Sequence, residues 1–256
     1  MTREQRPDAF LARQRAHFAT ADVEHFLWQT RGPGFAPREA AFVRDVLRGC
    51  AAPLLEVGCG EGANLLHLTA DGSTASHGGR WFGLDAFAAK LAFAAREVPA
   101  ARFTCGDAAA LPFADGSFAT VLIRDLLHHL PQPRRALEEA CRVLRPAGRF
   151  VLIEPNARNP LIRLQMALVP AERGAARSDA RWLRELLGGL PLRDVAFTEA
   201  APLPLDRLVL HHRFGLPRLG TSAAVVRMLH ALENAVSRVL PRSRWSYVVV
   251  HATRSG

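Results

Sequence analysis

The sequence predicts an α/β protein with a doubly wound, mostly parallel sheet that is covered by helices on both faces. From Leu54 onward, short apolar runs alternate with stretches whose apolar residues recur at helical spacing. Such runs, separated by helices, are typical of parallel strands buried on both faces. The first run also ends in a glycine-rich turn, 58–62, that leads directly into a helix, as this fold class requires.

Residues 1–49 precede this alternation and are expected to form a helical lid. They are charged and amphipathic, and the segment RGPGFAP, 31–37, interrupts the helical spacing because it contains proline and glycine. Trp28 precedes this break and Phe35 lies within it, where they either cover the ligand or form the core of a helix pair. The N-terminus lacks the apolar region of a secretory signal, and the four cysteines form no C-x-x-C pair, so we expect a reduced, cytoplasmic protein.

A single domain is expected over residues 50–256. Its predicted strands are 54–57, 81–85, 101–107, 118–125, 148–155, 192–200 and 246–254. Its predicted helices are 63–68, 86–97, 132–144, 159–170, 178–189 and 222–240. The insertion at about 156–190 is long enough to form a helical cap over the carboxyl edge of the sheet, where doubly wound folds bind ligands.

The glycine turn is the candidate ligand site. Gly58, Gly60 and Ala63 fit the dinucleotide pattern G-x-G-x-x-[GA], and Asp85 ends the second strand, where a ribose-binding acid is expected. Taken alone, this pattern is weak evidence for a nicotinamide dinucleotide.

Neighbouring features favour a different cofactor. Glu56 lies two residues before the first glycine, where a carboxylate would repel a pyrophosphate but attract a ligand with ammonium and sulfonium groups. Glycines at both 60 and 62 suit a flat ligand that lies along the backbone. Asp107 ends the third strand, so that acidic residues stand at the ends of three successive strands.

The motifs EVGCGEG, GLD, GDAAALPFADGSFATV, LHHL and ACRVLRPAGRFVLIEP occur in this order between Leu54 and Pro155. In this combination the sequence resembles the class I S-adenosylmethionine-dependent methyltransferases, in particular the type 11-like subgroup that acts on small molecules and lipid-like substrates. The resemblance implies a Rossmann-like sheet and S-adenosyl-L-methionine as cofactor. It also implies methyl transfer to a small, hydrophobic or lipid-like acceptor, on oxygen or carbon rather than nitrogen.

The resemblance assigns the methionine part of the cofactor to the first turn. Gly58, Gly60 and Gly62 would let it approach the backbone, and Glu56 would lie beside its amino group.

The nucleoside part is assigned to the following strand ends. Asp85 would accept both ribose hydroxyls, since a carboxylate has paired acceptors suited to a diol; the alternative is that it caps the next helix. Asp107, with the backbone of Ala108, would bind the adenine amine, or would serve only as a turn former. Arg124 would contribute mainly its backbone.

His128 and His129 are the candidate catalytic residues. Methyl transfer depends mainly on alignment and exclusion of water, and a base is needed only when the acceptor is a poor nucleophile. One of the two histidines can accept a proton near neutral pH, or the pair can be structural. Asp125 and Glu154 are weaker candidates. No metal site is expected.

The net charge of +9 is compatible with a nucleic-acid or anionic membrane partner. Lys90 is the only lysine, however, and the arginines are dispersed, which is typical of a GC-rich genome rather than of a nucleic-acid footprint. We therefore expect a small-molecule acceptor and no nucleic acid. The alternatives are a nucleic-acid methyltransferase, or a non-catalytic protein that uses the cofactor fold to bind a partner.

The C-terminal helix carries an apolar stripe from Val225 to Val239. Such a stripe predicts packing against the sheet. Arginines before and after the helix leave peripheral contact with a membrane surface as the alternative.

Overall fold

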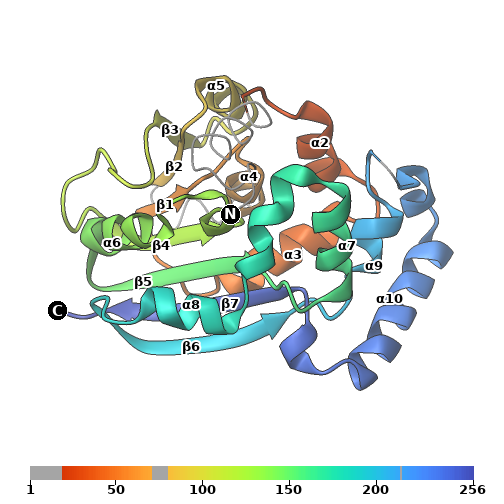
Figure 1. Ribbon diagram of the computed structural model, residues 1–256. Coiled ribbons are helices and arrows are strands. Elements are labelled where there is room, and N and C mark those ends of the chain that lie inside the picture. Colours follow the sequence, from red (N-terminus) through yellow and green to blue (C-terminus); the bar gives the residue numbers. More distant parts are fainter. Residues whose placement is uncertain (1–18, 71–79, 214) are drawn as a thin grey trace.

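The computed structural model describes residues 19–70, 80–213 and 215–256, which form a seven-stranded sheet surrounded by helices (Figure 1). Lid residues 1–18 and most of the loop before the second strand lie outside the described residues. The strands are β1 (Leu54–Val57), β2 (Trp81–Asp85), β3 (Ala101–Cys105), β4 (Phe118–Arg124), β5 (Leu144–Pro155), β6 (Leu192–Ala200) and β7 (Tyr247–Arg254).

The strand order is β3-β2-β1-β4-β5-β7-β6. β1 pairs in parallel with both β2 and β4, whereas β7 is antiparallel to β5 and β6. The chain thus runs outward from β1 in two directions, which confirms the predicted doubly wound, mostly parallel sheet. The change of direction between β1 and β4 places a crevice at the carboxyl ends of these strands, where such folds bind ligands.

Two hydrophobic cores cover the two faces of the sheet. Because neighbouring strand residues point to opposite faces, Leu54 belongs to one core and Leu55 to the other. The core of Leu54 includes side chains of α3 (Ala36–Val46), α4 (Ala63–Thr69) and α5 (Ala88–Glu97). The core of Leu55 includes those of α6 (Pro133–Val143) and α8 (Ala180–Leu187). Burial of each fully buried leucine stabilises the folded state by about 1.5–3 kcal/mol relative to an exposed leucine.

The lid helix α2 (Val23–Arg31) begins at Asp22, whose side chain accepts a hydrogen bond from the backbone N–H of His25. Trp28 stacks on Phe35, with ring centroids 3.9 Å apart and planes 3° from parallel. Both rings are buried and neither lines the large cavity described below. They therefore form the core of the α2–α3 pair, which was one of the two expected roles.

The expected cap divides into two parts. α7 (Pro160–Leu168) and the 3-10 helix η4 (Pro170–Arg177) lie beyond the carboxyl ends of β4 and β5 (Figure 1). α8 instead packs beside α6, where Leu183 and Leu187 join the core of the sheet. α8 therefore covers a face of the sheet and not its carboxyl edge, because its apolar residues pack in the same core as those of α6.

The C-terminal helix α10 (Ala223–Val239) does not place its whole stripe against the sheet. It packs on α9 (Leu205–Val209) and η5 (Pro217–Thr221) at the edge of the molecule (Figure 1). Its buried Glu233 pairs with Arg38 of α3 over 2.7 Å. Met228 and Leu232 are 54% and 48% exposed, so the expectation of sheet packing is wrong for this part of the stripe.

Among the described residues, no helix is both long and apolar enough to cross a membrane.

Candidate active site

A cavity of about 1120 Å³ opens at the carboxyl edge of the sheet. The turn after β1 and the ends of β2, β3 and β4 line one part of it, and α7, η4 and Tyr247 line another. Pockets for a single small ligand occupy about 300–1,000 Å³. This cavity therefore has room for a cofactor and a second molecule beside it.

The glycine turn forms because three residues adopt left-handed backbone conformations, with φ of +77° at Gly58, +52° at Gly60 and +82° at Gly62. Gly58 and Gly60 line the cavity, but Gly62 does not. A Cβ on Gly62 would lie 3.3 Å from both Ala94 and Phe103. Gly62 is thus required by its φ and by close packing against α5 and β3.

Glu56 is buried at the end of β1 and lines the cavity. Its Oε1 accepts a hydrogen bond of 2.5 Å from the side-chain amide of Asn64. Its Oε2 is buried without a hydrogen-bond partner among the described residues. Burial raises the pKa of Glu56 to about 7. A buried carboxylate oxygen without a partner is costly, and it is satisfied when a positively charged ligand group binds there.

Arg124 contributes its side chain as well as its backbone, which differs from the sequence-based expectation. The buried guanidinium donates to Glu39 and, over 2.8 Å, to Asn64. Burial alone would raise the pKa of Glu39, but Arg124 and Arg207 lower it to about 2. Arg124 thus anchors the lid helix α3 to the end of β4 and orients the amide that holds Glu56.

Asp85 and Asp107 both line the cavity at neighbouring strand ends. The carboxylate of Asp85 accepts hydrogen bonds from the backbone N–H of Gly60, over 2.9 Å, and of Phe87, over 3.0 Å. Asp107 accepts one from the backbone N–H of Ala109 over 2.8 Å. Asp107 therefore has the turn-forming contact of its structural alternative. Asp85 does not cap the next helix, because the N-cap of α5 is Phe87 and has no side-chain hydrogen bond. Both acids line the cavity. Ala108 lies buried beside Asp107 and also lines the cavity.

The two candidate histidines occupy different environments on η3 (Leu127–His129). His128 is buried, and its Nδ1 lies 2.7 Å from Glu154. Its Nε2 lies 3.5 Å from a carboxylate oxygen of Glu172. Burial would lower the pKa of His128, but Glu154 and Glu172 raise it to about 10. His129 lines the cavity, as does Glu172, whereas His128 does not.

Several polar residues at the cavity escaped the sequence reasoning. Four of them line the cavity, namely Asn64, Glu172, Arg207 and Tyr247. The fifth, Glu39, is not part of the lining but pairs with the lining residues Arg124 and Arg207. Asn64 could have been found from the sequence, since it follows the glycine turn by two residues at the start of a helix. Glu39 could also have been found, because it lies on the apolar side of α3.

Asp125 follows β4 with a φ of +50°, a conformation that is uncommon for residues other than glycine. It lines the cavity, and its carboxylate lies 3.3 Å from Nε of Arg124. Strained backbone of this kind clusters at functional sites.

Residues 55–152, which include the first turn and most of the strand ends described above, match the family model of the methyltransferase domain. The chain carries a methyltransferase domain. S-adenosylmethionine is the cofactor of class I methyltransferases, the family that the motifs had indicated.

The chain has curated relatives that it matches over part of their length. It is 38% identical over 108 residues to the phthiotriol/phenolphthiotriol dimycocerosates methyltransferase of Mycobacterium tuberculosis, covering 42% of this chain and 39% of that protein. It is 38% identical over 103 residues to the demethylmenaquinone methyltransferase of Renibacterium salmoninarum, covering 38% of this chain and 44% of that protein. The chain thus spans less than half the length of these relatives.

Solved structures resemble the chain over most of its length. Phosphoethanolamine N-methyltransferase 2 of Haemonchus contortus, in complex with S-adenosylhomocysteine, has a TM-score of 0.65 at 16% identity and covers 97% of this chain and 60% of that chain. Geranyl diphosphate C-methyltransferase of Streptomyces coelicolor has a TM-score of 0.58 at 20% identity, with coverages of 86% and 79%. At these identities the likeness establishes the class I fold alone.

Proposed function

We propose that the protein transfers a methyl group from S-adenosylmethionine to an oxygen or carbon atom of a small, lipid-like acceptor. The observation that carries the proposal is the carboxylate of Glu56, which lines a large cavity beside the glycine turn and has one buried oxygen without a hydrogen-bond partner among the described residues. The chemistry of this oxygen fits the ammonium group of the cofactor. A nicotinamide dinucleotide would bring a pyrophosphate to the same place and be repelled.

The residues along the strand ends suit the rest of the cofactor. When bound, S-adenosylmethionine supplies a methyl group that is activated by a positively charged sulfur. Asp85 is assigned to the ribose hydroxyls, and Asp107 with Ala108 to the adenine.

Charge-assisted hydrogen bonds contribute about 1.5–3 kcal/mol each, so Asp85→Asn should weaken cofactor binding at least tenfold in calorimetry.

The other part of the cavity suits an apolar acceptor with a polar reacting end. Ile162 and Met166 of α7 present apolar surface there, beside His129 and Glu172. The curated relatives are named for acting on phthiotriol dimycocerosates and on demethylmenaquinone, both lipid-like. These names, together with the mixed lining, support a hydrophobic acceptor.

We assign the proton-accepting role to His129, because it lines the cavity and His128 does not. With its pKa raised to about 10, His128 keeps its proton at neutral pH and is a positioning residue. Its ring contacts that of His129 at a centroid distance of 3.9 Å. In this arrangement Glu154 and Glu172 hold His128, and His128 fixes the ring that removes the acceptor proton.

The decisive experiment is a reaction with methyl-labelled S-adenosylmethionine and an extract of lipids and quinols, followed by identification of the labelled product. We expect label in an apolar product. His129→Asn should lower kcat at least tenfold for a hydroxyl acceptor while leaving cofactor affinity unchanged. Cofactor binding without any labelled product would favour the non-catalytic alternative. A thermal shift with NAD and none with S-adenosylhomocysteine would contradict the cofactor assignment.

We also propose that the outward face of α10 contacts an anionic membrane surface from which the acceptor is taken. Met228, Leu232 and Val239 are 54%, 48% and 80% exposed on one side of the helix. Arg227 and Arg238 are exposed beside this apolar stripe. An apolar stripe flanked by arginines binds at the interface of bilayers that contain anionic lipids.

Sedimentation with lipid vesicles tests this contact. Binding to vesicles with phosphatidylglycerol should exceed binding to pure phosphatidylcholine, and it should weaken as salt is raised. The variant Met228→Glu with Leu232→Glu should bind at least tenfold more weakly. Val195→Glu is the matched control, because Val195 is 41% exposed but lies on β6. Equal loss in both variants, or none in either, would contradict the assignment to α10.

A further inference from the structure

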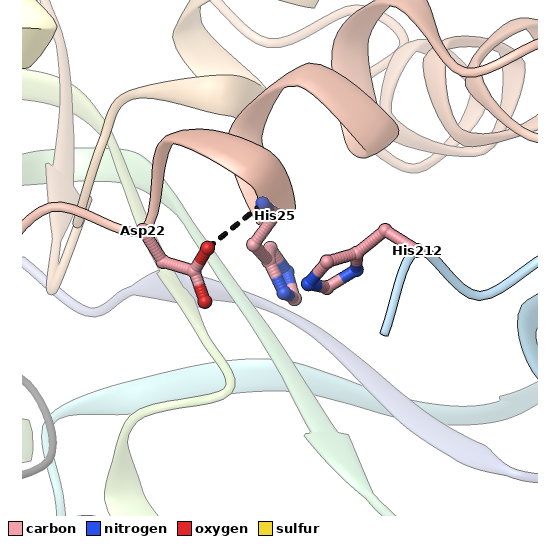
Figure 2. Close-up of side chains that lie close together, drawn as sticks. All are labelled: Asp22, His25 and His212. Carbon is pink, nitrogen blue, oxygen red and sulfur yellow. Dashed lines mark hydrogen bonds between the residues drawn. The ribbon is translucent and has the colours of Figure 1, made fainter. Parts of the chain in front are cut away.

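Three side chains from two distant segments of the described chain meet beside the cavity. Asp22 and His25 stand at the start of the lid helix α2, and His212 follows α9. Their ligand atoms all lie within 4.8 Å of one another. Figure 2 shows the ring of His25 next to that of His212, with the carboxylate of Asp22 near them; the two rings are nearly perpendicular, at 81°. We propose that these residues form a binding site for a divalent transition metal ion of the zinc type.

The donor set matches the chemistry of zinc. Two imidazoles and one carboxylate are a common three-ligand set for this ion, with bonds of about 2.0–2.2 Å and a fourth position left to water. In the tetrahedral geometry of zinc, two ligand atoms of one ion therefore lie about 3.3–3.6 Å apart. The ligand atoms of the three side chains lie within 4.8 Å of one another, so they would move together by about 1 Å when an ion binds.

The state of the donor groups also favours a cation. The Nδ1 atom of His212 is buried without a hydrogen-bond partner among the described residues. Asp22 uses one oxygen to cap α2, accepting from the backbone N–H of His25 over 2.9 Å.

The site lies between two segments that are far apart in the sequence. His25 lines the cavity, whereas His212 belongs to the segment that precedes η5 and α10. An ion held by both would tie the lid helix α2 to the C-terminal part of the chain beside the cavity. The site is separate from the strand ends that are assigned to the cofactor.

Calorimetry with zinc on the tag-free, chelator-treated protein, without cofactor, tests the site independently of methyl transfer. One zinc ion per chain is expected, with no comparable binding of magnesium. At a free zinc concentration 100-fold above Kd, Tm should rise by about 5–10 °C. Substitution of cobalt for zinc should give visible absorption bands that report the ligand field.

Variants separate this site from zinc binding elsewhere. His212→Asn should weaken zinc binding at least tenfold and abolish the cobalt bands. Asp22→Asn should also weaken it, while keeping α2 intact because asparagine is a good helix cap. His230→Asn on α10 is the matched control and should bind zinc normally. Unchanged zinc affinity in His212→Asn and Asp22→Asn, equal loss in His230→Asn, or no binding to the parent protein would overturn the proposal.

Discussion

Replacing Arg124 by methionine is expected to lower the free energy of unfolding by about 3–5 kcal/mol. The guanidinium is buried and donates hydrogen bonds to both Glu39 and Asn64. Methionine has a similar length but no charge, so among the ion pairs of the described residues the buried carboxylate of Glu39 would keep the one with Arg207, at 3.5 Å. An uncompensated buried charge is the main source of the expected loss. Urea unfolding followed by circular dichroism measures it.

Two further variants isolate the ion pair. Adding Glu39→Gln to Arg124→Met should recover part of the lost stability, because it removes the buried charge. Arg181→Met is the control: it breaks a 3.1 Å pair with Glu185 whose side chains are 86% and 65% exposed, and it should cost less than about 1 kcal/mol. A loss in Arg124→Met no larger than in Arg181→Met would contradict the role assigned to the buried pair.

The ion pair between Arg124 and Glu39 should also make the free energy of unfolding depend on pH. The folded-state pKa of Glu39 is about 2, below its ordinary value of 4.5. For a carboxyl group with a lowered folded-state pKa, the stabilisation is present above the unfolded pKa and is lost as pH falls through the folded pKa. The free energy of unfolding should therefore fall as the pH is lowered from about 4.5 to 2, and Arg124→Met should lose most of this dependence.

Replacing Glu56 by glutamine is expected to weaken the binding of S-adenosylhomocysteine by about 10- to 100-fold. The carboxylate oxygen without a partner is the group that we assign to the cofactor ammonium, and glutamine is neutral. The same substitution should raise the free energy of unfolding of the ligand-free protein at pH 8 by about 1–3 kcal/mol. Burial raises the folded-state pKa of Glu56, so the ionised side chain destabilises the protein when no cation is bound.

The pH dependence of binding gives a second test of Glu56. Its pKa in the free protein is about 7, and only the ionised carboxylate attracts the ammonium group. Affinity should therefore fall about tenfold from pH 8 to pH 6, and it should be nearly independent of pH in Glu56→Gln. Calorimetry at several pH values measures both slopes. Equal slopes in the two proteins would mean that another group controls cofactor binding.

The sequence by itself determined the sheet and the first turn, because both depend on local chemistry. Short apolar runs that alternate with helices are typical of central strands buried on both faces, and the left-handed conformations at Gly58 and Gly60 strongly favour glycine. Acids at the ends of parallel strands necessarily gather at one edge, which made Glu56, Asp85 and Asp107 foreseeable as a group.

Only the tertiary structure decided the pairings between distant segments. His128 and His129 are adjacent residues of the same type, so the sequence does not distinguish them. Packing buries His128 against Glu154 and leaves His129 at the cavity. Glu39 meets Arg124 because α3 packs across the end of β4, and His25 meets His212 because the start of α2 lies beside the segment after α9. Such contacts depend on how elements with apolar faces dock. The spacing of residues along the chain specifies those faces but not which charged or polar groups the docked faces bring together.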